Sequence, residues 1–360
     1  MPTASAPPPT VHSNAVHSNA VHSNAVHSKL RSLLSRALPV FSFASGAASA
    51  LFMDRGPKRA AAVAAGTVAA WLSLVVLHGL MRFELKEGQG RLPRLLLWLA
   101  RFSGMTLTQG MIQLGLFFCA PFYFHAAIVG VAQVDPWHTA FLAGLLLASA
   151  LTLWDPLTEW LLRKPLLAPL LPAVTSFATL NCVLPGLGLS TQRSLWIAAA
   201  AAALAPPLMI GALAPAGRRW RRALLALLTG LALMAALRLG ATRLIPAAPL
   251  RLVRAEIGTQ LDGKWIRDPG ERLASTPERL ICATAIASPV GLKDRLFHVW
   301  RKDGRELWRI ELELTGGRAE GYRTRSTLRH FPTPARGRYE CSVVTAAGQL
   351  LGTRALVIER

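Results

Sequence analysis

Residues 194–214 read SLWIAAAAAALAPPLMIGALA and residues 223–242 read ALLALLTGLALMAALRLGAT, with arginines at positions 218, 219, 221 and 222 between them. Each run is close to the ~20 apolar residues that a helix needs to cross a bilayer. Similar segments occupy 38–53, 60–81, 107–133, 138–154 and 165–189. The first is short, and an interfacial helix or a signal-like segment are alternatives there. The pattern predicts an α-helical transmembrane bundle of about seven helices within residues 38–247.

The charge of the chain changes near residue 250. Residues 1–249 contain 20 Lys and Arg but only 6 Asp and Glu, whereas residues 250–360 contain 20 and 13. The basic residues of the first part lie between apolar segments, where they set topology and meet anionic lipid. The net charge of +21 therefore does not indicate nucleic-acid binding. We expect a disordered low-complexity tail at 1–37, the multi-pass transmembrane domain at 38–247 and a soluble β domain at 250–360.

Basic residues also predict the orientation in the membrane. With seven crossings, the loops on the side of the N-terminus collect 14 Lys and Arg and the opposite side collects 6. Cytoplasmic loops carry the positive excess in membrane proteins. The rule places the N-terminus in the cytoplasm and the C-terminal domain on the other side of the membrane.

The C-terminal domain shows apolar residues at a period of two, separated by turn signals. We predict strands near 251–258, 279–287, 295–301, 306–314, 321–327, 338–345 and 350–359. The tetrapeptide at 302–305, Lys-Asp-Gly-Arg, is typical of a hairpin turn. This number of short strands in one small domain predicts an antiparallel two-sheet sandwich.

Two features favour an immunoglobulin-like sandwich. Tyr339 precedes Cys341 by two residues, as in a tyrosine corner, and Cys282 lies on a strand expected in the opposite sheet. A location outside the cytoplasm permits a disulfide between Cys282 and Cys341, and two unpaired buried thiols are the alternative. Trp300 fits less well, because alternation that points Phe297 and Val299 inward would turn Trp300 outward.

Several short runs resemble a known bacterial family, the domain of unknown function 2914. They are Phe297-His298-Val299-Trp300, Gly321-Tyr322-Arg323-Thr324, Gly337-Arg338-Tyr339, Val343-Val344-Thr345 and the segment 348–352. The preceding block, especially 116–123, is similar to the membrane part usually fused to that domain. The resemblance implies a bacterial inner-membrane protein, and it implies no activity, cofactor or catalytic residue.

The sequence contains no nucleophile elbow, phosphate loop, His-Glu-x-x-His or Cys-x-x-Cys motif. We therefore expect no enzymatic activity, no catalytic residue, no cofactor and no metal. Polar residues within apolar segments are costly in a membrane and are the better candidates. Gln109, Gln113, His125 and Asn181 either line a polar transport site beside a proline-broken segment or form hydrogen bonds between helices.

The β domain offers a candidate binding face of aromatic and cationic side chains. Its members are His298, Trp300, Trp308, Tyr322, Arg323 and Arg325. If exposed, they would suit an envelope glycan, an anionic polymer or an envelope protein, whereas the alternative places the aromatics in the core. We expect a membrane protein that contacts lipid and whose sandwich binds or organises envelope components. A transporter or transporter accessory subunit is the alternative function.

Overall fold

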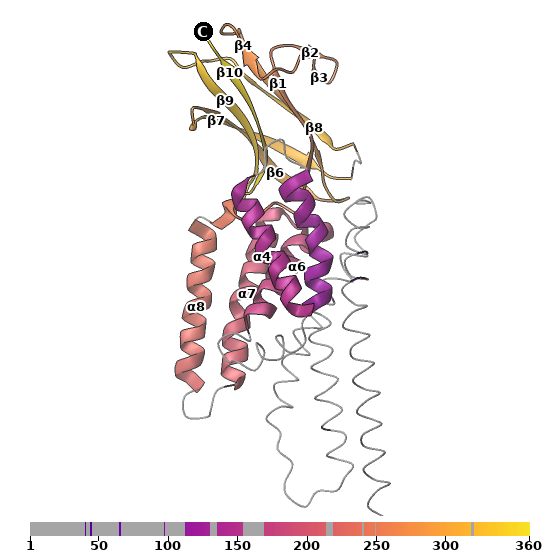
Figure 1. Ribbon diagram of the computed structural model, residues 1–360, viewed down its shortest axis with the longest axis vertical. Coiled ribbons are helices and arrows are strands. Elements are labelled where there is room, and N and C mark those ends of the chain that lie inside the picture. The colour runs from indigo at the N-terminus through magenta and orange to yellow at the C-terminus, as the bar shows by residue number, and fades with distance from the viewer. Residues whose placement is uncertain are drawn as a thin grey trace, which may run out of the picture.

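A computed structural model describes residues 112–129, 135–153, 169–213, 219–239, 241–248, 250–317 and 320–360, together with the single positions 40, 44, 65 and 97. The predicted tail, the two apolar segments before residue 82 and Gln109 lie outside these continuous ranges. The described chain has a helical part and a β part, which Figure 1 shows one beyond the other along the long axis.

The helical part begins with an α-helix at 112–124 that continues as the π-helix η1 (His125–Val129). The further α-helices are α4 (Pro136–Leu153), α6 (Leu170–Val183), α7 (Thr191–Leu213) and α8 (Arg219–Leu239). The 3-10 helix η2 (Leu184–Leu187) follows α6, and the 3-10 helix η4 (Ala241–Arg243) follows α8. In Figure 1, α8 lies beside α7 at the edge of the helical part.

The prediction of a seven-helix bundle is wrong. The described residues contain five α-helices, and two helical stretches among them, Pro136–Leu153 and Leu170–Leu187, are long and apolar enough to cross a membrane. An apolar run in the sequence does not distinguish a crossing helix from a shorter buried one. The run at 165–189 illustrates this, since Leu170–Leu187 is long and apolar enough to cross a membrane, yet 72% of this stretch is buried inside the protein.

Small residues bring the helices together. A Cβ atom at Gly230 of α8 would lie 2.4 Å from the carbonyl oxygen of Ala203 in α7. A Cβ atom at Gly115 would lie 2.7 Å from Thr179 Oγ1 of α6. Both contacts are shorter than van der Waals separation, so these two helix pairs pack at their present distance only because the residue is glycine.

The β part is a sandwich of two main sheets. The first has the order β1-β5-β8, formed by β1 (Arg251–Gly258), β5 (Leu280–Ala287) and β8 (Tyr322–Leu328). The second has the order β4-β10-β9-β6-β7, formed by β4 (Arg272–Leu273), β10 (Leu350–Ile358), β9 (Gly337–Thr345), β6 (Lys293–Lys302) and β7 (Arg305–Thr315). Between β1 and β4 in the sequence, β2 (Leu261–Asp262) and β3 (Trp265–Ile266) form a small hairpin that is a separate two-stranded sheet. The predicted β-sandwich is confirmed, and each predicted strand has a counterpart.

Three features near the disulfide are typical of immunoglobulin-like sandwiches. Cys282 of β5 and Cys341 of β9 form a disulfide between the sheets, with a Cα–Cα distance of 6.5 Å. The Tyr339 hydroxyl donates a hydrogen bond to the Ala335 carbonyl oxygen at 2.7 Å, which makes the tyrosine corner. Trp300 is fully buried in the same core cluster as both cysteines.

The expected outward position of Trp300 is therefore wrong. On β6 the residues that face the other sheet are Leu296, His298 and Trp300. Val299 is also fully buried although it belongs to the opposite side of the strand. Because β6 lies between β9 and β7 and carries apolar residues on both of its faces, apolarity alone does not show which set of alternating residues faces the core.

The helical part and the sandwich are joined by buried polar contacts. Asp294 of β6 accepts a hydrogen bond from the Thr191 amide at 2.8 Å and so caps the first turn of α7. Gln349, which is 1% exposed, donates from Nε2 to the Ile245 carbonyl oxygen at 3.3 Å. These contacts span about a hundred residues of sequence and fix the sandwich against the helix ends.

Candidate functional site

The polar residues of the helices do not meet at one site. Gln113 donates from Nε2 to the Thr152 carbonyl oxygen of α4 at 2.7 Å. Asn181 of α6 donates to the Tyr123 hydroxyl at 3.0 Å, and that hydroxyl donates to the Ala178 carbonyl oxygen at 3.1 Å. Each bond joins two helices, so these side chains are used in helix packing.

His125 has a different environment. It lies in the π-helix η1 at the end of the helical part, where its Nε2 is 3.2 Å from Arg251 of β1. His125 is half-buried and contacts the sandwich rather than Gln113 or Asn181. Gln109, the fourth predicted member of this group, lies outside the described residues.

A chain of hydroxyl and ring groups crosses the interior of the sandwich. His298 lies between two hydroxyls, with Nε2 2.9 Å from Thr284 Oγ1 and Nδ1 2.7 Å from Ser326 Oγ. The indole nitrogen of Trp300 donates to the same Ser326 oxygen at 3.0 Å, and Thr284 continues the chain to Thr324 at 2.7 Å. Burial lowers the pKa of His298 to about 4, so the ring is neutral near pH 7.

Cys282, His298 and Cys341 form a compact group of potential metal ligands, whose ligand atoms lie within 4.8 Å of one another. The disulfide uses both sulfur atoms, and both ring nitrogens of His298 contact hydroxyls. A metal needs a thiolate and a ring nitrogen with a free lone pair. In this oxidised form the group is part of the packed core and does not offer a metal centre.

The predicted binding face is divided by the fold. His298 and Trp300 are fully buried, whereas Trp308 is 55% exposed on the edge strand β7. Tyr322 is half-buried and packs against the core below the first sheet. Arg323 and Arg325 lie on the outer face of that sheet, opposite to the side that holds His298.

The outer face of the first sheet carries a different cluster. The strand register places Arg254, Ala285 and Arg323 in one row across β1, β5 and β8, and Glu256, Ala283 and Arg325 in the next. Residues directly opposite each other share a face. Because the central strand presents only alanines there, the flanking long side chains close over it.

Trp265 of the β2–β3 hairpin completes this cluster. The guanidinium carbon of Arg254 lies 4.2 Å from the centre of the Trp265 ring, and that of Arg323 lies 5.9 Å from it. We call Arg254, Trp265, Arg323 and Arg325 the Arg–Trp cluster. Arg254 is paired with Glu256 at 2.6 Å and Arg323 with Glu320 at 2.8 Å, whereas Arg325 is exposed and has no carboxylate partner among the described residues.

Sequence reasoning missed Arg254 and Trp265. The signal for them was the Asp262-Gly263 pair, which is typical of a hairpin turn and would have placed Trp265 on a short strand. The half-buried Trp265 ring lies beside two guanidiniums, and an aromatic ring next to positive charge suits sugars and anionic groups.

Two known protein families match parts of the chain. A family of unknown function, DUF5924, matches residues 19–285, and a protein family of unknown function, DUF2914, matches residues 293–357. The predicted resemblance to DUF2914 is thereby confirmed for that segment. No curated protein and no solved structure matches the chain. The border between the two families falls between β5 and β6, so the disulfide links the two matched segments. Because the match to DUF5924 covers well over half of the chain, the chain belongs to this family of unknown function.

Proposed function

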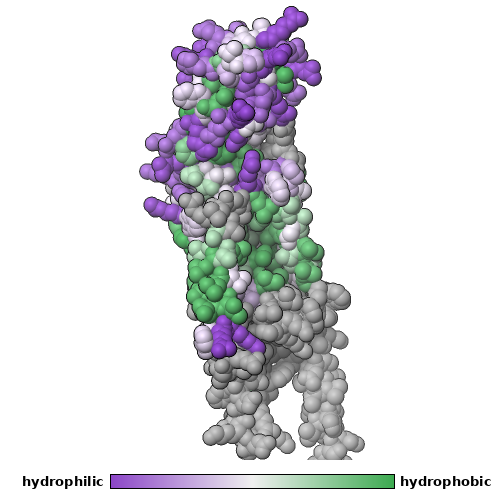
Figure 2. Space-filling model, turned by 90° about the vertical axis from the view of Figure 1, so that its left-hand side faces the viewer, coloured by the Kyte–Doolittle hydropathy of each residue, from purple (hydrophilic) through white to green (hydrophobic). Residues whose placement is uncertain are grey.

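We propose that this protein is an integral protein of the bacterial inner membrane whose β-sandwich lies outside the cytoplasm and binds anionic components of the cell envelope. The observation that carries the proposal is a change of surface along the molecule. In Figure 2 the helices present a hydrophobic band, and the sandwich beyond it is mostly hydrophilic.

The hydrophobic band consists of large apolar side chains, whose exposure to water would be unfavourable. The exposed large hydrophobic residues of α4, α6, α7 and α8 are Trp137, Leu146, Leu147, Leu153, Leu170, Val174, Ile197, Leu204, Trp220, Leu224, Leu225, Leu227, Leu228, Leu231 and Leu233. On the sandwich the described residues of this kind are Val253, Val290, Trp308 and Val357. A contiguous apolar surface of this extent is unusual on a soluble monomer and supports contact with lipid.

Helix α8 supports the same conclusion by its packing. Its buried positions include Ala226 and Gly230, while the leucines from Leu224 to Leu233 are exposed. A helix in water buries its large apolar residues, whereas helices in lipid associate through small residues and turn large ones toward the acyl chains.

Two observations support a sandwich outside the cytoplasm. Arg219, Arg221 and Arg222 begin α8 at the end that lies away from the sandwich in Figure 1, and they favour that orientation by the positive-inside rule. The Cys282–Cys341 disulfide is compatible with an oxidising compartment. An alkaline phosphatase fusion to Arg360 tests the orientation, because the enzyme is active only outside the cytoplasm. An inactive fusion that is present in normal amount would contradict this part of the proposal.

The Arg–Trp cluster supplies the binding surface. Arg325 is unpaired among the described residues and Arg323 is paired only with Glu320, a glutamate that is itself mostly exposed. An anionic polymer can therefore displace Glu320 at low cost, since surface ion pairs contribute little to stability. The ligand class that fits is a glycan carrying carboxylate or phosphate groups, which would stack on Trp265 and pair with the arginines.

Binding is tested with the purified full-length protein and polygalacturonate, with neutral dextran as the comparison polymer. We expect retention on polygalacturonate that falls with added salt, and at least tenfold weaker binding for Arg323→Gln/Arg325→Gln. The control Arg329→Gln/Arg336→Gln removes the same charge from two exposed positions in another part of the sandwich. Equal losses in both double variants would show a general charge effect and no specific surface.

A further inference from the structure

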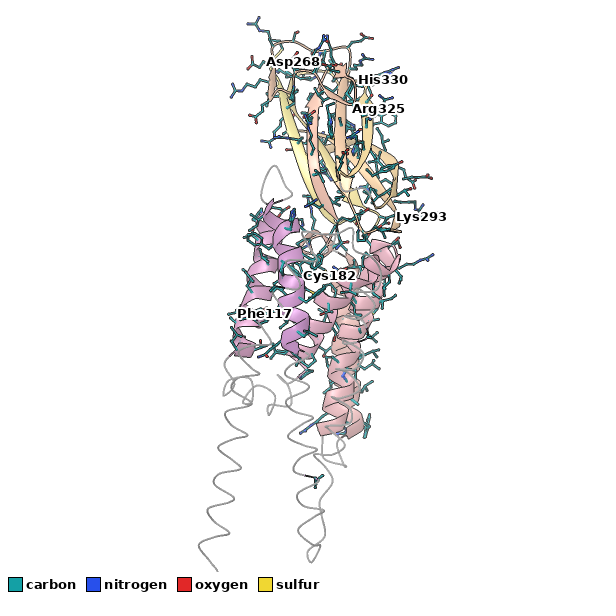
Figure 3. All side chains as sticks on the ribbon, turned by 90° about the vertical axis from the view of Figure 1, so that its right-hand side faces the viewer. Phe117, Cys182, Asp268, Lys293, Arg325 and His330 are labelled. Carbon is teal, nitrogen blue, oxygen red and sulfur yellow. A yellow bond between two sulfur atoms is a disulfide. The ribbon has the colours of Figure 1, made fainter. Side chains whose placement is uncertain are left out.

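A second cationic feature lies at the junction of the two parts. A cleft of about 600 Å³ is bordered by the loop before α7 and by the ends of β6 and β7. Its cations are Arg193, Lys293 and Arg295, and its carboxylates are Asp294 and Glu313. Figure 3 shows Lys293 at this junction, while Arg325 and His330 lie farther along the sandwich.

The acidic residues neutralise this cleft only in part. Asp294 accepts hydrogen bonds from the amides of Thr191 and Arg295, both at 2.8 Å, so its charge is directed at the α7 N-terminus. Arg295 pairs with Glu311 at 3.5 Å. Within the described residues, Arg193 and Lys293 have no carboxylate at ion-pair distance. These two exposed cations remain available to an anion.

The cleft continues into the apolar surface of α7. Ile197 follows Arg193 by four residues, which is about 6 Å along a helix and returns to the same face. Leu204 lies on the same stripe, and Ile197 and Leu204 are 43% and 51% exposed. A cationic cleft therefore stands directly above an apolar stripe on one helix face.

We propose that this cleft binds the headgroup of an anionic phospholipid, with the phosphate near Arg193 and Lys293 and an acyl chain along Ile197 and Leu204. The proposal rests on the membrane location given above. A bound lipid would hold the sandwich at a fixed height, because the cleft has one wall on the helices and the other on β6 and β7. A soluble envelope polymer has no acyl chain and would not use the stripe.

Lipid binding is measured by native mass spectrometry of the full-length protein in detergent, titrated with dioleoyl-phosphatidylglycerol and, separately, with dioleoyl-phosphatidylcholine. We expect tighter binding of phosphatidylglycerol and at least a tenfold loss in Arg193→Gln/Lys293→Gln. The control Arg329→Gln/Arg336→Gln removes equal charge from the sandwich and should retain wild-type binding. Ile197→Ser/Leu204→Ser should also weaken phosphatidylglycerol binding, which a site for the headgroup alone would not show.

Three results would overturn the proposal: equal affinity for both lipids, equal losses in the cleft and control variants, or full competition by glycerophosphoglycerol, which has no acyl chain. Carbonate extraction of membranes separates this failure from failure of the proposed function. Protein released by carbonate would contradict the membrane location itself. Protein that stays in the membrane without a preference for phosphatidylglycerol would contradict only the lipid site.

Discussion

The helices and the sandwich differ in the side chains that cover their outer surfaces. In the sandwich, tryptophan, tyrosine, leucine and isoleucine fill the interior, and arginines and glutamates cover the outside. In the helical part, Leu116, Tyr123 and Phe177 are likewise buried, but leucines also cover the outside, and Gly115 and Gly230 allow close approach of neighbouring helices. The same amino acids therefore have different roles on the two sides of residue 250.

This difference is the basis of the proposal that the helical part lies in lipid and the sandwich in water. Water drives large apolar groups together, so a sandwich in water gains most from burying them. Lipid exerts no such force, and helices in lipid gain from close approach and from hydrogen bonds between them. The predictions below test the contrast by changing one interaction at a time.

The largest effect is expected from Trp300→Ala. The indole is fully buried beside the disulfide and donates a hydrogen bond to Ser326. Its loss leaves a cavity and removes one of the two hydrogen bonds of the Ser326 hydroxyl, so the sandwich should be destabilised by about 3–5 kcal/mol. Hydrogen exchange of the β6 and β9 amides in the full-length protein measures this change.

Trp308→Ala is the matched control, because Trp308 is the cross-strand neighbour of Trp300 and is 55% exposed. Its substitution should cost less than about 1 kcal/mol. If both variants had the same effect, burial by the opposite sheet would not be what makes Trp300 important.

Acid should weaken the sandwich through His298. The unfolded ring has a pKa near 6.5, and burial lowers the folded pKa to about 4. Between these values the unfolded state binds more protons, so stability is fully present above about pH 6.5 and is lost as the pH falls toward 4. The loss should be about 3 kcal/mol.

The pH dependence is measured by hydrogen exchange, corrected for intrinsic rates, between pH 7 and pH 4.5. His298→Gln should be less stable at pH 7 but should lose the dependence in this window. Glu306, whose pKa is lowered by its hydrogen bond to Arg309, contributes only at more acidic pH. A slope that persists in His298→Gln would assign the effect to other groups.

The sandwich was largely predictable from sequence, and the reason is local. Period-two patterns predict strands directly, and pairs such as Asp303-Gly304 predict the turns between them. The tyrosine-corner motif is also local, because Tyr339 and Cys341 are only two residues apart. Trp300 was misplaced because β6 carries apolar residues on both faces, so the choice between its two sides depends on the partner sheet. The Arg–Trp cluster was missed in part because its arginines meet only through the β1-β5-β8 register and Trp265 reaches them from the β2–β3 hairpin.

The helical part was less predictable. Apolar composition indicates which segments avoid water but not how many cross a membrane, and the count of seven was wrong for this reason. Gln113 and Asn181 looked like members of a polar site because their partners are unrecognisable in sequence. Gln113 bonds to a backbone carbonyl, and Asn181 bonds to a tyrosine 58 residues away.

A smaller effect of defined sign is expected where glycine separates helices. Gly230→Ala would press a methyl group against the Ala203 carbonyl of α7, where the Cβ atom would lie 2.4 Å from oxygen. Such overpacking should destabilise the α7–α8 pair by about 1–3 kcal/mol. Gly144→Ala in α4 is the control, because nothing lies within 4 Å of its Cβ position.

At Gly144 the substitution should stabilise the helix by about 0.5–1 kcal/mol, since alanine loses less conformational entropy. Thermal melting of the full-length protein in detergent, followed by far-ultraviolet circular dichroism, reports both variants. The opposite signs sharpen the contrast with the sandwich, because one added methyl group decides helix association. Two changes of the same sign would argue that α7 and α8 do not depend on close approach.

The smallest effect is expected from the hydrogen bond between α6 and the helix at 112–124. Asn181→Ala and Tyr123→Phe each remove one partner of a 3.0 Å bond, and in a double-mutant cycle they should couple by about 0.6–1.7 kcal/mol. A residue of a transport pathway would instead leave stability unchanged and alter flux. A coupling energy near zero would therefore favour a functional role for Asn181. The expected coupling energy would show that its side-chain amide stabilises the packing of the two helices.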